Sequence, residues 1–545
     1  MTTASLTLLA VLGATALFAQ PKFEAADVQV SPKEPGPQFA RMPRPVNGRY
    51  EVHGATIIDL IRVGWVTDPD RILGGPPWVE MDRFNIVAKM PEHADQAELG
   101  DMVKALLLDR FKLAVHEGKQ PMPGYALTAG KKPAMKPGDD SGETGCRIQQ
   151  NNAPAAPGGP VLMMSTNGQP TRIALGPGGV IEYTCRNMTM DSFVDALRTM
   201  IGTGLGNKTV LNQTGLEGKW DFNLRFSLGM LGGNNPDRIA FNDAVEKQLG
   251  LKLNEISVPT QVVVIDKVER KPTPDPPGTA EALPPAPKSP TAFDAASIRP
   301  SDPAQRGGMT NWNRNRFTAQ NITLAGLVMQ AFRTADRMMI NSDAVVGLPN
   351  VVDSARYDIT ATASIADGTA ADMAPMIRSL LEERFKMKWH EEKRPVNAYT
   401  LIAVKPKMKK ADPASRSHCI RGNGAPGSPP GTQMMTCQNI AMDDFVDQLL
   451  GAGPGLNWPV RNSTGLEGGW DFPLSYGRGP ALAMAAPPGG GGEGRGGPVA
   501  EASDPSGSLT LFEAIEKQLG LKLEMQKRPE SVVVIDHLEE KPTEN

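Results

Sequence analysis

The chain has 545 residues, which is long enough for two or more domains, and its formal net charge is −3. Gly (56 residues) and Pro (49 residues) are abundant and aromatic residues make up 5% of the chain, so much of it is expected to be loop or linker. This charge balance gives neither a basic field for nucleic acid nor an acidic field for calcium, and we expect no nucleic-acid partner.

The amino-terminal segment contains an apolar run from Leu6 to Ala19 that ends in small residues. Such a run is typical of a secretory signal peptide, here over residues 1–20, although no Lys or Arg precedes it; an uncleaved membrane anchor is the alternative. No later segment is apolar enough to span a membrane. We therefore expect a periplasmic or secreted protein with no membrane span after signal cleavage.

One stretch of the chain occurs twice, first over Phe241–Pro272 and again over Leu511–Pro542. The blocks EKQLGLKL and VVVID are identical in the two copies, and the phrase FEAADVQVSP at Phe23 returns as FDAASIRPS at Phe293. A Pro-dense segment between the halves is expected to be an extended linker. The sequence thus predicts a signal peptide (1–20), a first module (21–270), a linker (271–292) and a second module (293–545).

Hydrophobic periodicity predicts the elements of the first half of each module. In module one a helix is expected over Thr56–Trp65 with Thr56 as its cap, followed by a strand over Phe84–Lys89. Apolar residues then mark a helix over Leu99–Leu107 that leads into the strand RFKLAVHE. A second strand at Tyr125 is expected to pair with it as an antiparallel hairpin through a Pro-containing turn.

The closing unit of each module is predicted to be a helix followed by a hairpin. Phe241, Val245 and Leu249 form a helical stripe, Gly250 stands where a helix ends, and Thr510 begins a capping box in the second copy. LKL then starts a strand, a Pro-containing turn is expected, and VVVI reads as a strand covered on both faces. The fold class is therefore α+β, with short helices packed on small antiparallel sheets and each module made of two small lobes.

The cysteines number four and fall two in each module. An exported chain with this distribution predicts one disulfide per module, with free thiols as the alternative. No CxxC or Cys–His cluster indicates a metal site, and no cofactor is expected. The predicted pairs are Cys146 with Cys185 and Cys419 with Cys437.

Two repeated His–Glu pairs are the first candidates for chemistry, at His116–Glu117 and His390–Glu391. They resemble half of the metalloprotease HExxH motif, but no second His follows and each pair ends a predicted strand. Adjacent strand residues point to opposite faces, so a solvated strand face is the expected setting for His116 and His390.

Aspartates form the second set of candidates. Asp266 and Asp536 end the VVVID strands, where carboxylates serve either in catalysis or in turns. Asp221 and Asp471, in the phrase WDF, are expected to be turn residues between aromatic core anchors. His116, His390, Asp266 and Asp536 are therefore kept as candidate functional residues, and no catalytic residue is assigned.

Several phrases together resemble a known family: F-[ED]-A-A at the mature start, RFK followed by His–Glu, TGLEG with WDF, EKQLGLKL and VVVID. The chain is similar to an uncharacterised family of exported proteins that is expanded in Acidobacteria and was first defined in Solibacter. The resemblance covers nearly all of the mature chain twice, whereas members usually carry one copy. It implies no activity or catalytic residue. Similar domains appended to membrane metallopeptidases of the antirepressor type imply an extracytoplasmic sensing or binding role.

These observations favour a non-enzymatic binding or sensing protein that acts in the cell envelope or outside the cell. Its expected partner is a protein, peptide or envelope polymer, and two linked copies would gain avidity for paired sites. The alternative is an extracytoplasmic hydrolase, associated with peptidases, that uses the His–Glu or Asp candidates.

Overall fold

A computed structural model gives the fold of the chain. It describes residues 21–543 except for these segments: 34–39, 43–44, 96, 131, 140–141, 150–160, 167–168, 175–178, 202–207, 228–238, 287–289, 303–307, 314, 333–343, 350–354, 366–369, 424–427, 430–431, 450–451, 453–455, 457, 459 and 478–507. The predicted signal peptide and the Gly/Pro-rich insert near residue 490 lie outside the described residues.

Lobe 1, residues 21–110, is a sheet with the order β1-β4-β2 and two helices packed on one face. Alternate residues of β4 are buried, and they meet the apolar stripe of α1 and α2 in one core. α1 begins as predicted, because Thr56 and Asp59 form a capping box. The elements of lobe 1 are β1 (Ala25–Val30), β2 (Arg49–Ala55), α1 (Ile57–Trp65), β3 (Ile72–Gly74), β4 (Phe84–Lys89) and α2 (Leu99–Arg110).

Lobe 2, residues 135–250, repeats this order of elements with its own core. Its sheet has the order β6-β12-β10-β7, and a separate hairpin, β8–β9, lies between β7 and β10 in the chain. Its last helix, α4, ends in a π-helical turn over Val245–Leu249. The elements are β6 (Lys136–Pro137), β7 (Gly145–Ile148), β8 (Val161–Thr166), β9 (Gln169–Ala174), β10 (Val180–Met188), α3 (Met190–Ile201), β11 (Val210–Gln213), β12 (Trp220–Ser227) and α4 (Phe241–Ala244).

Lobes 3 and 4 repeat the pattern in module two, over residues 293–385 and 408–520. Their sheets have the orders β14-β18-β16-β15 and β20-β24-β22-β21. Lobe 3 contains β14 (Ala295–Pro300), β15 (Met309–Asn313), β16 (Arg316–Thr323), α6 (Leu324–Ala331), β17 (Val345–Val346), β18 (Arg356–Thr362) and α7 (Ala370–Arg384). Lobe 4 contains β20 (Lys409–Lys410), β21 (His418–Asn423), β22 (Thr432–Ile440), α8 (Met442–Leu449), β23 (Arg461–Asn462), β24 (Trp470–Gly477), α9 (Leu511–Ala514) and a π-helical turn (Ile515–Leu519).

A β-bulge at the same place shows that the four lobes are structural equivalents. In each lobe the strand before the first helix bulges, and one bulge residue adopts a positive φ of 46–62°. Its backbone N–H donates to a carboxylate or amide oxygen on the central strand. The four bonds are Gly54 to Asn85 (2.9 Å), Asn187 to Asp221 (2.8 Å), Asn321 to Asp358 (2.7 Å) and Asn439 to Asp471 (2.8 Å).

A long two-stranded ribbon joins the two lobes of each module. β5 (Ala114–Ala129) pairs with β13 (Leu251–Lys267), and β19 (Lys388–Ala403) pairs with β25 (Leu521–His537). One end of each ribbon enters the core of the first lobe and the other end enters the core of the second lobe. Short strands from both lobes extend each ribbon to four strands, in the orders β11-β5-β13-β3 and β17-β25-β19-β23.

The continuous ribbons correct the predicted hairpins. The strand β5 begins only at Ala114, since Arg110 of the segment RFKLAVHE ends helix α2, and it runs on without a turn through Tyr125. LKL and VVVI likewise belong to a single strand, with no Pro-containing turn between them. The prolines lie directly opposite each other, Pro121 facing Pro259 and Pro395 facing Pro529. In an antiparallel ladder, every second pair of facing residues exchanges no N–H···O bonds. Two facing prolines, which have no N–H, fit at such a pair, so the ladder loses no hydrogen bond. The prediction that VVVI is covered holds in module two, where Val532–Ile535 are all buried.

The linker is not uniformly extended, because it contains a short helix, α5 (Thr279–Ala282), and is tied to lobe 1. Arg110, which is 4% exposed, donates through Nε to the carbonyl of Thr273 at 3.0 Å and pairs with Asp275. Arg49 donates to the carbonyl of Pro284 at 2.5 Å. The linker is therefore attached to lobe 1 between residues 273 and 284 by Arg contacts that Pro content alone does not predict.

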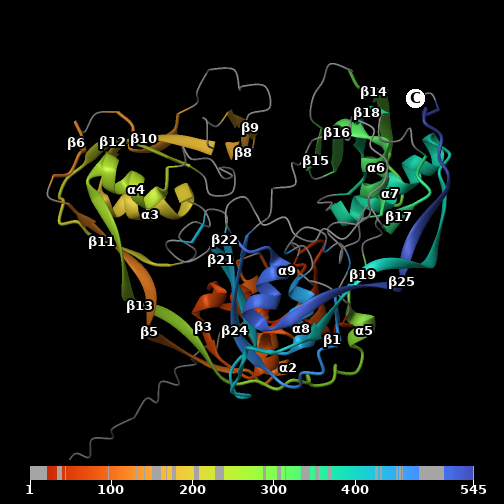
Figure 1. Cartoon of the computed structure of the whole chain (residues 1–545), viewed down its shortest axis with the longest axis horizontal. Coiled ribbons are helices and arrows are strands. Elements are labelled where there is room, and N and C mark those ends of the chain that lie inside the picture. The colour runs from red at the N-terminus through yellow and green to blue at the C-terminus, as the bar shows by residue number, and fades with distance from the viewer. Residues whose placement is uncertain are drawn as a thin grey trace, which may run out of the picture.

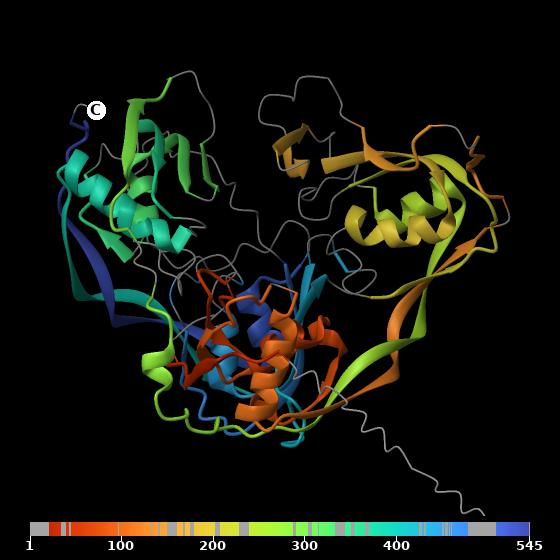
Figure 2. The same cartoon turned by 180° about the vertical axis from the view of Figure 1, so that it is seen from behind.

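Lobes 1 and 4 lie side by side at the centre of the molecule, as both views show (Figures 1 and 2). The ribbon β5/β13 leads from this centre to lobe 2, and the ribbon β19/β25 leads to lobe 3. Lobes 2 and 3 therefore stand on the same side of the paired central lobes, at the ends of two ribbons (Figure 1). No helix among the described residues is long and apolar enough to cross a membrane.

Candidate functional site on the ribbons

The candidate residues His116 and Asp266 contact each other where the first ribbon leaves lobe 1. His116 faces Val264 across the ribbon, and a bulge between Ile265 and Lys267 turns Asp266 toward the His side chain. The Nδ1 atom of His116 lies 2.8 Å from Oδ1 and 2.9 Å from Oδ2 of Asp266. The sequence identified both residues but did not pair them.

Module two repeats the contact at the same bulge. The Nδ1 atom of His390 lies 2.9 Å from Oδ2 of Asp536. Its other nitrogen, Nε2, lies 3.6 Å from Glu392, a position that is Gly118 in module one. The neighbouring Val115 and Trp389 point the other way and pack against the cores of lobes 1 and 3. Strand alternation thus sends the His–Asp pairs to the outer face of each ribbon.

Both pairs are open to solvent, as the sequence predicted for the His residues. The side chains of His116 and Asp266 are 59% and 47% exposed, and those of His390 and Asp536 are 48% and 46% exposed. Cavities of about 550 Å³ and 520 Å³ are lined by other residues, in lobe 1 with the linker and in lobe 3. Among the described residues, no group of three or more His, Cys, Asp or Glu side chains could hold a metal ion.

The geometry can orient an imidazole but does little more by itself. A carboxylate on Nδ1 fixes the ring and its tautomer, as in hydrolases where His acts as a general base. General-base catalysis also needs a nucleophile or water held within hydrogen-bond reach and shielded from bulk solvent. Surface pairs of this kind are worth about 0–1 kcal/mol, so the contact is a weak brace for the bulge.

Asp221 and Asp471 lie in the strands β12 and β24 of lobes 2 and 4, and not in turns as predicted, whereas the aromatic residues on either side of them do pack in the lobe cores. Each accepts the N–H of the bulge Asn described above, and Asp221 also lies 3.7 Å from Arg186. The structure therefore does not bring Asp221 to His116 or Asp266. The sequence missed the shared role of these carboxylates, although an aromatic residue followed by Asn or Asp recurs in every lobe (Phe84–Asn85, Trp220–Asp221, Tyr357–Asp358, Trp470–Asp471).

The predicted disulfides are present, and each staples an edge strand to its neighbour. Cys146 on β7 lies directly opposite Cys185 on β10, and Cys419 on β21 lies opposite Cys437 on β22. Only lobes 2 and 4 carry them among the described cysteines, and none of these cysteines is free. Two disulfides fit a chain that folds in an oxidising compartment.

The family model described as "Protein of unknown function (DUF3738)" matches residues 58–268 and 298–538. The chain belongs to this family. Each match begins within the first lobe of a module and runs to the end of its ribbon, so one DUF3738 match spans most of two lobes and the ribbon between them. No curated protein and no solved structure gives a significant match to the chain.

Proposed function

We propose that this DUF3738 protein is exported and acts in the cell envelope or outside the cell as a non-enzymatic binding scaffold. The apolar amino terminus and the two disulfides support export. The expected partner is a protein, peptide or envelope polymer.

The observation that carries the proposal is the fourfold use of one lobe. The residues that recur in all four lobes form the bulge and its hydrogen bond, which are parts of the fold. Repeated small units, each with its own core, are typical of proteins that present an extended surface to a partner. Lobes 2 and 3 stand apart on one side of the central pair, so a partner that touches both would be held at two points (Figure 2).

Photo-cross-linking in the native envelope tests the proposal. A photoreactive residue replaces Arg147 on β7 of lobe 2 or Met309 on β15 of lobe 3, because both are exposed residues on the edge strands of their sheets. We expect both positions to capture the same partner. Val66, which is 90% exposed on lobe 1, is the matched control and should not capture it. Identical products from all three positions, or none from lobes 2 and 3, would contradict the proposal.

A hydrolase is the second candidate, favoured by the recurrence of the His–Asp contact in both modules. The variant His116→Asn/His390→Asn separates the two functions, because it removes the imidazole base and leaves the rest of the ribbons intact. The binding proposal expects unchanged cross-linking and no hydrolysis of peptide or polymer substrates by either protein. Hydrolysis by the wild type that the variant loses would favour the hydrolase.

A further inference from the structure

A short arm of lobe 4, residues 415–418, contacts lobe 1 directly. Arg416 donates through Nη1 to the carbonyl of Ile72 at 2.6 Å, and its Nε lies 2.9 Å from Oε2 of Glu80. The backbone N–H of Ser417 donates to the carbonyl of Pro77 at 3.4 Å. The Arg416 and Glu80 side chains are only 16% and 26% exposed, so this ion pair is better shielded than the pair Lys33–Asp444 between the same lobes, whose Lys side chain is 64% exposed.

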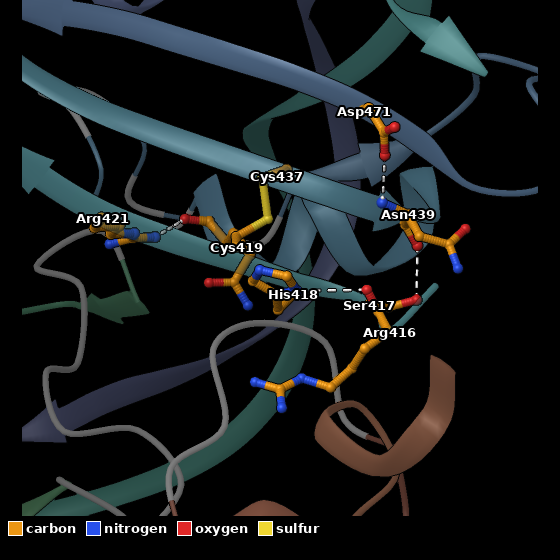
Figure 3. The surroundings of a disulfide bond; sticks show 9 residues. Arg416, Ser417, His418, Cys419, Arg421, Cys437, Asn439 and Asp471 are labelled. Carbon is orange, nitrogen blue, oxygen red and sulfur yellow. Dashed lines mark hydrogen bonds between the residues drawn. A yellow bond between two sulfur atoms is a disulfide. The ribbon is translucent and has the colours of Figure 1, made fainter. Parts of the chain in front are cut away.

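Three features of lobe 4 hold the arm in place (Figure 3). The Ser417 hydroxyl donates to the carbonyl of Asn439 at 2.6 Å, and the side-chain amide of Asn439 donates to the carbonyl of Ser415. Asn439 is itself fixed by Asp471, at the bulge that all four lobes share. The disulfide from Cys419 then anchors the strand that begins where the arm ends. The common bulge of the fold thus serves in lobe 4 to aim Arg416 at module one.

Two further contacts join lobes 1 and 4. Met81 of lobe 1 packs against the hydrophobic core of lobe 4. Lys33 lies 2.6 Å from Asp444, with the Lys side chain 64% exposed. Burial raises the pKa of the Glu80 carboxyl, and the charges of Arg416 and His418 oppose that rise while Asp59 adds to it. The two charged side chains are partly shielded from solvent and come from different lobes, so their charge-assisted contact favours the one relative position of lobes 1 and 4 in which they meet.

The equivalent positions in the other two lobes lack this complementarity. Counting back from the first cysteine of each disulfide, Arg416 corresponds to Glu143 in lobe 2. Glu143 pairs instead with Arg147 in its own lobe. Glu80 corresponds in sequence to Asp353 of lobe 3, a residue outside the described segments. A contact of the same kind between lobes 2 and 3 would therefore oppose two acidic residues.

We propose that the Arg416 arm locks the two modules into one body through a docking surface specific to lobes 1 and 4. Lobes 2 and 3 take no part in this docking and stay separate from each other. The lock is a property of the tandem chain, because its two halves come from different modules.

Specific cleavage of the full chain tests the lock. A protease site is placed at residues 287–289, beyond the part of the linker that is tied to lobe 1, and the cut protein is analysed by gel filtration at micromolar concentration. We expect the two halves to elute together. The variant Arg416→Glu should weaken their association at least tenfold, and the double variant Arg416→Glu/Glu80→Arg should restore it. Glu143→Arg, the equivalent change in lobe 2, is the matched control and should leave co-elution unchanged.

Separation of the cut wild-type halves would overturn the proposal whatever the variants do. Co-elution of the cut Arg416→Glu protein with wild-type affinity would also overturn it, provided that circular dichroism and the absence of free thiols show that lobe 4 has folded. Loss of association in Glu143→Arg would show that the effect is a general consequence of charge reversal and would contradict the assigned surface.

Discussion

At the scale of single residues, we expect the carboxylates on the central strands to contribute more to the stability of the fold than the exposed candidate residues do. Asp471 accepts the N–H of Asn439, a residue that is 6% exposed and held at a φ of 46°. Asp266, by contrast, braces an exposed bulge through His116. Aspartate therefore contributes differently to stability at the two positions. Loss of Asp471 leaves a buried N–H donor unsatisfied, which is costly, whereas loss of Asp266 removes only an exposed pair.

The variant Asp471→Ala tests this difference. It leaves the N–H of Asn439 without its acceptor, and we expect a loss of about 1–3 kcal/mol in the stability of lobe 4. Hydrogen exchange of the β22 and β24 amides measures the loss. Asp266→Ala is the control and should change the stability of lobe 1 by less than about 1 kcal/mol. Equal effects of the two changes would contradict the assigned roles.

Tyr50 is expected to make the stability of lobe 1 depend on pH. Burial raises the pKa of the Tyr50 phenol to about 12, and the side chain is stacked on Phe23. The unfolded chain loses this proton near pH 10, whereas the folded chain keeps it. Tyr50 therefore stabilises lobe 1 fully below pH 10, and this contribution is lost as the pH rises from about 10 to about 12.

A spectrophotometric titration of the phenols checks the Tyr50 assignment. The chain has 6 tyrosines, and Tyr50→Phe should remove one phenol from the phase that ionises above about pH 11. Alkaline unfolding of lobe 1 should also begin at higher pH in the variant. Removal of the phenol from the phase near pH 10 would show that Tyr50 is not buried as described.

At the scale of elements, each lobe has one left-handed residue between its last helix and the ribbon. Lobes 2 and 4 use glycine, at Gly250 and Gly520, and both have a φ of 68°. Lobes 1 and 3 use lysine, at Lys112 (φ 47°) and Lys386 (φ 52°). A Cβ at Gly250 would lie 2.5 Å from the carbonyl of Lys132, and one at Gly520 would collide with the carbonyl of Lys405. The lack of room for a Cβ atom, and not only the positive φ, therefore determines where glycine is required.

Substitutions at the left-handed residues of lobes 4 and 3 distinguish the effect of steric collision from the effect of the positive φ. Gly520→Ala should destabilise lobe 4 by more than about 2 kcal/mol, because it adds a collision to the cost of a left-handed Ala. Lys386→Gly relieves the strained angle but adds freedom to the unfolded chain, so we expect a change within about 1 kcal/mol in lobe 3. Thermal unfolding followed by limited proteolysis distinguishes the lobes. A mild effect of Gly520→Ala would contradict the close approach of Lys405.

Local signals in the sequence predicted most elements, and non-local contacts account for the errors. The caps at Thr56 and Thr510, the stop at Gly250 and the disulfides follow from residues close in the chain or from their repetition. The ribbons were mispredicted as hairpins because Pro259 reads as a turn until Pro121 is known to face it. Likewise, His116 and Asp266 could be identified singly, but their contact depends on the register of β5 and β13.

At the scale of the whole molecule, the chain uses one lobe design four times and joins the lobes in two ways. Continuous ribbons join the lobes within a module, and the Arg416 arm joins lobe 4 to lobe 1 across modules. The two modules share several blocks of sequence, yet the arm depends on Arg416 and Glu80, which stand at positions where the modules differ. Repetition therefore identified the modules, whereas the docking surface could not be predicted from it.

The most direct test of the account compares the affinity of the intact wild-type protein and the intact Arg416→Glu variant for the partner captured from lobes 2 and 3. If the partner is held by both lobes on a locked base, the variant should bind at least tenfold more weakly, while its lobes keep wild-type circular dichroism and both disulfides. Unchanged affinity in a variant whose docking is broken would contradict the claim that the two modules act as one binding body.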